Sequence, residues 1–597
     1  MYVNKVIGST YVTSLFPERP VIHFAPEVST CCRSDLQVQK TRAKAVATLT
    51  IGEFDAKETI LICSVCDEIY MSNELREIVP PRCKFGYDVL VYVGKAAFHH
   101  CRTDKQIIRE LAVKKISISP SEVAYLEKRF IVYLALAHRQ SSQRIKEALA
   151  VRGGYILHLD GTCEGDSPHL MSGLDEISGI VLHNVKIPSE NADSIIPFLE
   201  KIKKEYGTPL AIVSDMGHGL SSAVKQVFQD VAHLLCHFHF LRDIGKDLLG
   251  KENDVIRKRL RKHKITSKLR NRARSLKQII DDNPKLIDAL HAGVENGQLL
   301  DCALKLAPVV SAYGLIFWAL DGKNQGRGYG FPFDRSYVTF VQRLRFLYGQ
   351  LVKLRDIRLR GDWRDNRPFL KLQCLLLDVV SDPVLRKAHT EIESKMEVFD
   401  KLRNAMRITV DDQHRGLNDN GEDAEIKTIE KGVEDFRRWL LNDVRYSKDN
   451  DYNKMVVQID KYWEKLFADP IIVDTPQGKV TFQPQRTNNI MERFLRDIRR
   501  DHRRKSGVNS MSRKLKSMLA DTPLVKNLEN EEYFKIILNG HSNLEELFSE
   551  MDAESVREEL RNSQKYSERI PSKIRQIMKK TDLPQIVMAI FRRQAVA

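Results

Sequence analysis

The stretch from Tyr155 to His239 constrains the fold of this chain more than any other. It opens with a short apolar run that ends in Asp160, and a second apolar run, residues 209–214, is followed directly by Asp215. A buried strand that ends in an acid delivers a carboxylate to the edge of a sheet. The sequence therefore predicts two strands that each end in an aspartate.

The segments around these aspartates predict the remaining elements. Residues 170–173 and 179–187 can form a hairpin, and residues 191–206 have the pattern of a crossover helix. A helical pattern follows Asp215, and then come a third strand-like run at 231–235 and an amphipathic segment. The predicted order is strand, strand, strand, helix, strand, helix, strand, helix, which indicates a mixed α/β fold.

Two further motifs carry candidate functional groups. The strand-like run at 231–235 leads into Cys236-His237-Phe238-His239, a C-x-x-H motif, and residues 485–494 read QRTNNIMERF. Helical spacing in this second segment separates an apolar face from a polar one. The apolar face has Ile490, Phe494, Leu495 and Ile498, and the polar face has Asn488, Glu492, Arg496, Arg499 and Arg503. An acid within a stripe of arginines suits a group that faces metal and DNA phosphate.

Together these motifs resemble the ribonuclease H-like catalytic core of DDE transposases, particularly the Mutator-like group with its C-x-x-H signature. The segment around Glu492 is similar to the N-N-x-x-E-R helix of many bacterial insertion-sequence transposases. The resemblance implies that Asp160, Asp215 and Glu492 are the catalytic acids and hold two Mg²⁺ or Mn²⁺ ions. For the C-x-x-H motif we favour a structural role that puts His239 near the active site as a candidate catalytic residue. A zinc site formed by Cys236 and His239 with Cys163 or His237 is the alternative.

The same resemblance implies what the protein acts on. A transposase of this kind binds the terminal inverted repeats of its insertion sequence and then cleaves and rejoins double-stranded DNA. Because two DNA ends must be paired, at least two subunits are expected in the complex. Within the helix of Glu492, the arginines expected to bind DNA are Arg496, Arg499 and Arg503.

The charge of the chain agrees with a polyanionic partner. Lys and Arg number 95 against 79 Asp and Glu, which gives a formal charge of +16 and a pI near 9.2. The excess is clustered in residues 257–274 and 493–516. The N-terminus lacks the apolar core of a secretory signal, and no apolar stretch is long enough for a membrane helix. We therefore expect a cytoplasmic, nucleoid-associated protein.

The N-terminal segment, residues 1–102, is rich in cysteine and is expected to form a small β domain that resembles a zinc ribbon. Cys63-Ser-Val-Cys66 has the knuckle spacing of a tetrahedral zinc site. The expected ligands are Cys63 and Cys66, with Cys31 or Cys32, preferably Cys32, and with Cys83. A zinc-free β domain with buried thiols is the alternative.

Residues 103–148 predict a helix-turn-helix. A threonine-capped helix opens at Thr103, and Ser119 with Glu122 supplies a capping box for a second helix. If the second helix reads DNA, the side chains facing the major groove are Ser121, Tyr125 and Arg129. A generic helical linker is the alternative.

The predicted organisation places the first part of the core at 150–250 and an all-α insertion at 251–470. In Mutator-like transposases such an insertion resembles a DNA-end clamp. Residues 471–527 complete the core with the helix of Glu492, and residues 528–597 form a C-terminal helical tail. Two other functions remain open: a catalytically inactive, transposase-derived DNA-binding protein, and a nuclease that cuts RNA–DNA hybrids.

Overall fold

The structure of the protein, a computed structural model, describes residues 19–297, 306–355, 366–408, 426–565, 577 and 580–594. The chain divides into two compact units. The first unit comprises Met1–His233, Pro470–Pro484 and Asn488–Ala597, and the second comprises Leu234–Asp469 and Gln485–Thr487.

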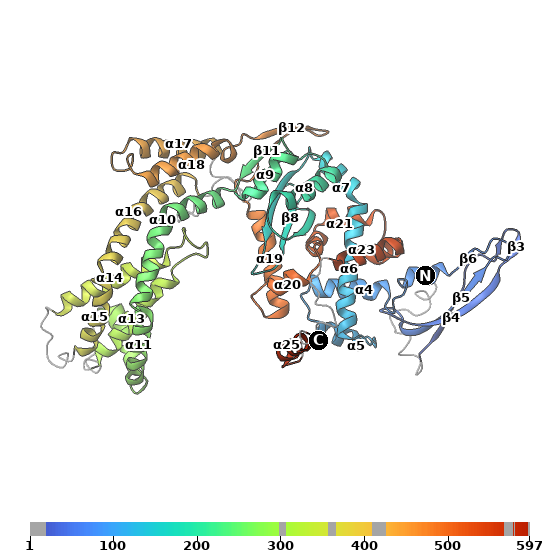
Figure 1. Ribbon diagram of the computed structural model, residues 1–597, viewed down its shortest axis with the longest axis horizontal. Helices are drawn as coiled ribbons and strands as arrows, with labels where there is room; N and C mark the ends of the chain where they lie inside the picture. Colours follow the sequence, from blue (N-terminus) through green and yellow to red (C-terminus); the bar gives the residue numbers. More distant parts are fainter. Residues whose placement is uncertain are drawn as a thin grey trace. The chain divides into compact units, whose positions relative to one another are not determined.

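A five-stranded mixed sheet organises the first unit (Figure 1). Its strand order is β11-β10-β7-β8-β9, with β8 antiparallel to both neighbours and β10 parallel to β7. The central run of β7 is buried from Ile156 to Leu159, as expected for a strand covered on both faces. The strands are β7 (Ile156–Thr162), β8 (His169–Asp175), β9 (Val181–Ile187), β10 (Ala211–Ser214) and β11 (Ala232–Leu235).

Three helices accompany this sheet. Helix α8 (Ala192–Tyr206) is capped by the Asn191 side chain, which accepts from the backbone N–H of Ser194, and it packs on β9 and on α9 (His218–Val227). Helix α19 (Asn489–Ser506) packs on β7 and buries Phe494 and Leu495. The predicted order of strands and helices from 155 to 239 is confirmed.

A second layer of helices precedes and follows the sheet. The threonine cap predicted at Thr103 and the capping box predicted at Ser119 are both present, and Gln106 completes a capping box at Thr103 as well. Helix α6 (Pro120–Gln140) is the centre of this layer, since it contacts α4 (Tyr87–Phe98), α5 (Asp104–Val113), η4 (Thr522–Glu529), α22 (Leu544–Ser549) and α23 (Ala553–Lys565). The other elements are α7 (Ser142–Val151), α20 (Ser512–Ser517) and α21 (Glu531–Leu538). A further helix, α25 (Leu583–Gln594), comes later in the sequence.

The N-terminal segment is more than the β domain that the sequence predicts. A long antiparallel hairpin, β4 (Gln37–Thr48) with β5 (Gly52–Ile62), is followed by two helices that belong to the main hydrophobic core (Figure 1). The helices are α3 (Asn73–Ile78) and α4 (Tyr87–Phe98), and the short strands are β1 (Val21–Phe24), β2 (Thr30–Cys31), β3 (Ser34–Asp35) and β6 (Ile69–Tyr70).

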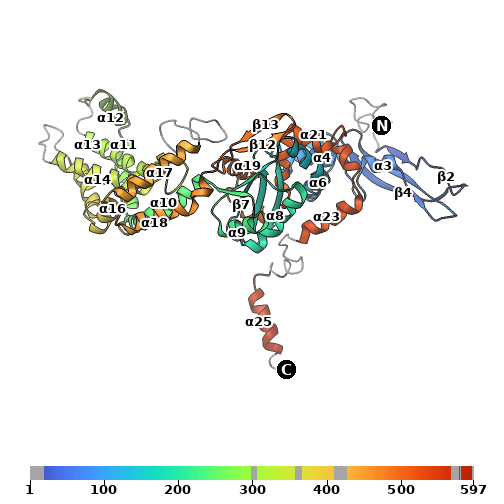
Figure 2. The same ribbon diagram turned by 90° about the horizontal axis from the view of Figure 1, so that it is seen from above.

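The second unit is mostly helical. Within the described residues of 251–470 all regular structure is helix. Helix α10 contacts both α16 and α18 along the unit (Figure 2). The helices are α10 (His237–Lys262), α11 (Ile265–Asp281), α12 (Lys285–Asn296), α13 (Ala307–Asp321), η2 (Gly322–Asn324), α14 (Ser336–Arg355), α15 (Arg367–Val380), α16 (Pro383–Ala405), α17 (Ile426–Asn442) and α18 (Asn450–Leu466).

After the helical unit the chain forms a hairpin in the first unit, β12 (Ile471–Thr475) with β13 (Gly478–Phe482), and then enters α19. Among the described helices of the whole chain, none combines the length and the apolar character needed to cross a membrane.

Candidate active site

The first two candidate acids lie side by side on parallel strands. Asp160 is near the end of β7, and Asp215 follows the last residue of β10. Val213 pairs with His158, so continuing that register by two residues puts Asp215 opposite Asp160. Residues in register on neighbouring strands point to the same face. The sheet alone therefore holds two carboxylates at one edge.

The third candidate acid, Glu492, is in the first turn of α19, and the buried amide of Asn488 fixes that helix to β7. The Nδ2 of Asn488 donates to the carbonyl of Leu159 at 3.0 Å, and the Oδ1 of Asn488 accepts from Nδ1 of His158 at 2.8 Å. The backbone N–H of Glu492 donates to the carbonyl of Asn488 at 3.0 Å. Leu159 is the residue before Asp160, so this amide ties the helix of the third acid directly to the strand of the first.

Electrostatics links the three acids. The pKa of Asp160 is raised to about 7, first by burial and then by the negative charge of Asp215, and Glu492 acts in the same direction. The backbone N–H of Gly161 donates to Oδ1 of Asp160 and opposes this rise. Among the described residues, the carboxylate oxygens of the three acids are not all within 4.8 Å of one another, so the acids do not form a closed cluster. The acids are close enough to repel one another, and a bound cation would relieve that repulsion.

A fourth acid, Glu190, joins the group and was missed by the sequence analysis. It lies in the loop between β9 and α8, and a Cβ added at Gly161 would be 2.6 Å from its Oε1. Nδ1 of His169 lies 3.0 Å from the same oxygen. The charge of Glu190 also contributes to the raised pKa of Asp160.

Two glycines let the Glu190 loop approach both strand ends. Besides Gly161, which follows Asp160, a Cβ at Gly219 would lie 2.0 Å from the backbone oxygen of Glu190. Gly161 directly follows Asp160, and Gly219 lies four residues after Asp215 in the first turn of α9. Close backbone approach at both positions requires the absence of a Cβ. Those glycines were the available signal, but a polar loop carries no periodicity that would have indicated its position.

The arginines of α19 lie where the helical pattern predicts them. Arg496, Arg499 and Arg503 are exposed, while Phe494 and Leu495 are buried on the opposite side. A guanidinium N–H of Arg499 donates to Oγ1 of Thr162, the last residue of β7, at 3.0 Å. The row of exposed arginines on α19 therefore lies next to the strand that carries Asp160.

One of the side chains predicted to reach the major groove is not available to it. Arg129 is 5% exposed, because its guanidinium donates to the hydroxyls of Tyr125 and Tyr133 and lies in the core side of α6. The prediction that Arg129 contacts DNA is therefore wrong. Ser121 and Tyr125 are exposed near the start of the same helix and stay predicted contacts.

The C-x-x-H motif opens the long helix α10 in the second unit. Cys236 is its buried N-cap residue, and His239 is half-buried in the first turn. The ring of His237 between them is buried and donates from Nε2 to the carbonyl of Leu466 at 2.7 Å. Burial lowers the pKa of His237 to about 3. The motif thus begins a packed helix, and a role for His239 at the active site stays a prediction.

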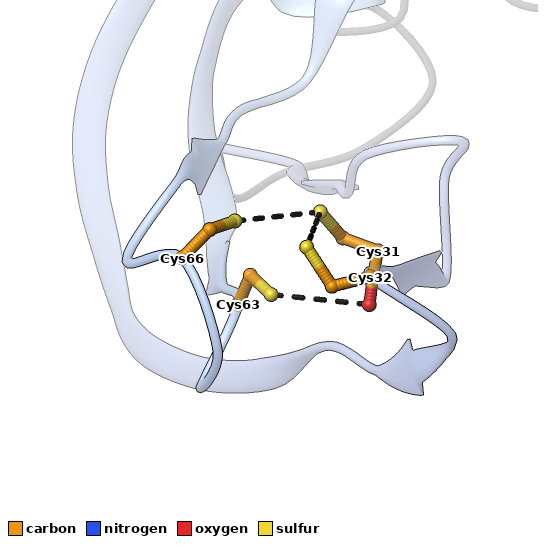
Figure 3. Close-up of side chains that lie close together, drawn as sticks. All are labelled: Cys31, Cys32, Cys63 and Cys66. Carbon is orange, nitrogen blue, oxygen red and sulfur yellow. Dashed lines mark hydrogen bonds between the residues drawn. The ribbon is translucent and has the colours of Figure 1, made fainter.

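The N-terminal cysteines form a second candidate centre in the first unit. The sulfurs of Cys31, Cys32, Cys63 and Cys66 all lie within 4.8 Å of one another (Figure 3). The prediction that Cys83 is the fourth ligand is wrong, because Cys83 is buried in the main hydrophobic core and lies outside this group of thiols. Backbone N–H groups of Val65 and Cys66 lower the pKa of Cys63 to about 7. Four thiols in this arrangement are compatible with zinc.

Comparison with known families connects these features to a class of protein. The family described as "Transposase, Mutator family" matches residues 103–297, about a third of the chain. The matched segment contains α5 to α7 and the whole five-stranded sheet, with Asp160 and Asp215, and it ends before Glu492. This match supports a transposase of the Mutator family. A comparison with curated proteins finds no match to this chain.

The contacts of Asn488 predict a sharp loss of stability. Replacing Asn488 with Ala leaves the His158 ring nitrogen and the Leu159 carbonyl buried without their partner. We expect the free energy of unfolding to fall by about 2–4 kcal/mol, measured by urea denaturation. The control is Asn489→Ala at the next, half-buried position, with an expected change of about 0.5 kcal/mol or less. Equal effects of the two substitutions would show that the Asn488 amide does not hold the helix.

Proposed function

We propose that this protein is a DNA transposase that binds the terminal inverted repeats of an insertion sequence and then cuts and joins DNA strands with the help of divalent metal ions. The observation that carries the proposal is the convergence of Asp160, Asp215 and Glu492 from β7, β10 and α19. The match to Mutator-family transposases over the same sheet supports it.

The sheet supports a DDE-type core. A strand order of β11-β10-β7-β8-β9, with β8 antiparallel to β7 and β9 and with β10 parallel to β7, is the order of ribonuclease H-like sheets. In that architecture the first and fourth strands present the first two acids and a later helix presents the third. β7, β10 and α19 are the corresponding elements of this chain.

The donor set fits hard divalent cations. Carboxylate oxygens are the ligands that Mg²⁺ and Mn²⁺ prefer. The pKa of Asp160 is raised first by burial and then by the charges of Asp215 and Glu492, and a bound cation would offset those charges. Asp160, Asp215 and Glu492 would hold two such ions, which when bound would supply activation of an attacking water or 3′-hydroxyl and stabilisation of the leaving oxygen of a phosphodiester. The protein's part is to hold the carboxylates rigidly, which the Asn488 bridge does for Glu492 and the strand register does for the aspartates.

Other residues of the first unit would bind the DNA. The exposed guanidinium groups of Arg496, Arg499 and Arg503 neutralise backbone phosphates next to the acids. Ser121 and Tyr125 on α6 are proposed to contact the inverted repeat. Because two transposon ends must be paired, the active form contains at least two copies of the chain.

Removing any of the three acids should abolish catalysis while leaving DNA binding intact. We expect Asp160→Asn, Asp215→Asn and Glu492→Gln each to lower metal-dependent cleavage by more than about a hundredfold, because each removes a metal ligand. The assay is cleavage of a labelled duplex carrying the element's end, in Mg²⁺ or Mn²⁺, with binding followed by gel shift. Asp230→Asn, an exposed acid before β11, is the control that should cleave normally.

Either of two outcomes would reject this function. Tight, specific binding of the element's end without cleavage by the wild-type protein would identify a catalytically inactive DNA-binding derivative. Cleavage of RNA–DNA hybrids in preference to the duplex would identify a nuclease.

Glu190 should strengthen metal binding. Glu190→Gln keeps the size of the side chain but removes a negative charge next to Asp160, so we expect the affinity for Mn²⁺ to fall by about 10–100-fold. Mn²⁺ binding to the DNA-free protein is measured by electron paramagnetic resonance. Asp193→Asn, on the exposed first turn of α8, is the matched control and should leave the affinity unchanged. Equal affinities of the Glu190→Gln variant and wild type would remove Glu190 from the site.

The arginines of α19 should contribute to affinity regardless of DNA sequence. Arg496→Ala, Arg499→Ala or Arg503→Ala each removes a phosphate contact, so the slope of log K against log salt should decrease in magnitude by about 1. Fluorescence anisotropy with specific and random duplexes over a salt series measures it. Arg557→Ala, which breaks an exposed pair with Glu554 on α23, is the control. A loss confined to the specific duplex would show that these arginines read bases instead.

A further inference from the structure

The four thiols gathered at the end of the β4–β5 hairpin come from two separate loops. Cys31 and Cys32 lie at the turn between β2 and β3, while Cys63 and Cys66 lie in the turn from β5 to β6. The Sγ of Cys31 is 3.6 Å from that of Cys66 and 3.7 Å from that of Cys32 (Figure 3). The carbonyl of Cys31 also lies 3.8 Å from the sulfur of Cys63. Both loops therefore direct their thiols to one point.

These sulfur separations match a metal site and not a disulfide. Bonded sulfurs in a disulfide are about 2.05 Å apart. Four sulfurs bound to zinc at about 2.3 Å in a tetrahedron are about 3.8 Å from one another. The observed spacings agree with the edge of that tetrahedron.

The backbone of both loops is shaped to present the thiols. In the β5–β6 turn the N–H of Val65 points at the sulfur of Cys63 at 3.4 Å, and the N–H of Asp67 donates to the Cys63 carbonyl. Asp67 has a φ of 57°. In the other loop Cys32 and Arg33 have φ values of 50° and 61°. Left-handed backbone at non-glycine residues costs free energy and persists where surrounding contacts enforce it.

The end of the β4–β5 hairpin that carries the cysteines needs a stabilising contact, and the opposite end does not. Gln37 pairs with Ile62, next to Cys63, and the β4 residues from 37 to 43 are exposed. At the opposite end Val46 and Phe54 are buried in the main core. Two short strands and two turns without a hydrophobic core are not stable by themselves, and small domains of this kind are commonly closed by a metal.

We propose that Cys31, Cys32, Cys63 and Cys66 bind a single structural zinc ion that joins the β2–β3 turn to the β5–β6 turn. Four protein thiolates complete the tetrahedral shell and leave no position for water or substrate, so the site stabilises the hairpin end and performs no chemistry. This inference goes beyond the proposed transposase and does not depend on it. It also replaces Cys83 with Cys31 in the ligand set.

The test is the metal content of the full-length protein. We expect one zinc ion per chain by elemental analysis, and the Co²⁺-substituted protein should have the visible absorption of a tetrahedral tetrathiolate site. Cys31→Ser and Cys66→Ser should lose the bound metal. Cys83→Ser and Cys374→Ser should retain it, since Cys83 is in the core and Cys374 is an exposed cysteine on α15.

A second readout does not depend on any variant. Arg33 is exposed next to Cys32, so removal of zinc with a chelator should accelerate tryptic cleavage after Arg33, and added zinc should reverse this. Wild-type protein that contains no zinc and gains no Co²⁺ spectrum would overturn the proposal. So would loss of metal from Cys83→Ser together with its retention by Cys31→Ser.

Discussion

The buried side-chain amide of Asn488 is the interaction on which the candidate active site depends. It joins the start of α19 to β7 through two hydrogen bonds, one to the backbone of Leu159 and one to the ring of His158. The ring of His158 in turn contacts the carboxylate of Glu176 at 2.8 Å. A buried polar group that loses its partner costs as much as several favourable contacts supply. The helix therefore has one low-energy position against the strand, and Glu492 takes its place from that position.

The same region concentrates negative charge at a cost to stability. The strand register brings Asp160 and Asp215 together, and the close approach of the Glu190 loop at Gly161 and Gly219 adds a further carboxylate. Burial is the largest cause of the raised pKa of Asp160, and the negative charges of these groups add to it. Functional sites commonly carry such a local cost, and the surrounding packing compensates for it. Here the compensation comes from the buried strands and from the core face of α19.

The parts of the fold that the sequence predicted are those with strong local signals. The runs around Asp160 and Asp215 are apolar and bounded by acids and glycines, Thr103 is a typical helix cap, and Ser119 has the spacing of a capping box, so their elements were predictable. Helix α4 was not, because its many β-branched and aromatic residues also suit a strand.

The errors have a different origin, in side-chain packing and strand pairing that no local sequence pattern shows. Helical spacing puts Arg129 near Tyr125, but only the packed structure shows that both tyrosine hydroxyls hold it in the core. Cysteine spacing identifies the Cys63-Cys66 pair and leaves its partners open, because hairpin register decides which other cysteines meet it. Register also decided the role of Glu190, since a loop between a strand and a helix has no pattern of its own.

The order of the elements along the chain also sets the order in which they are synthesised. Asp160 and Asp215 leave the ribosome before the whole helical unit, and Asn488 and Glu492 follow it. At about 5–20 residues per second, roughly a quarter of a minute to a minute separates the second acid from the third. During that interval a nascent chain carries two of its three candidate acids and lacks the helix that positions the third.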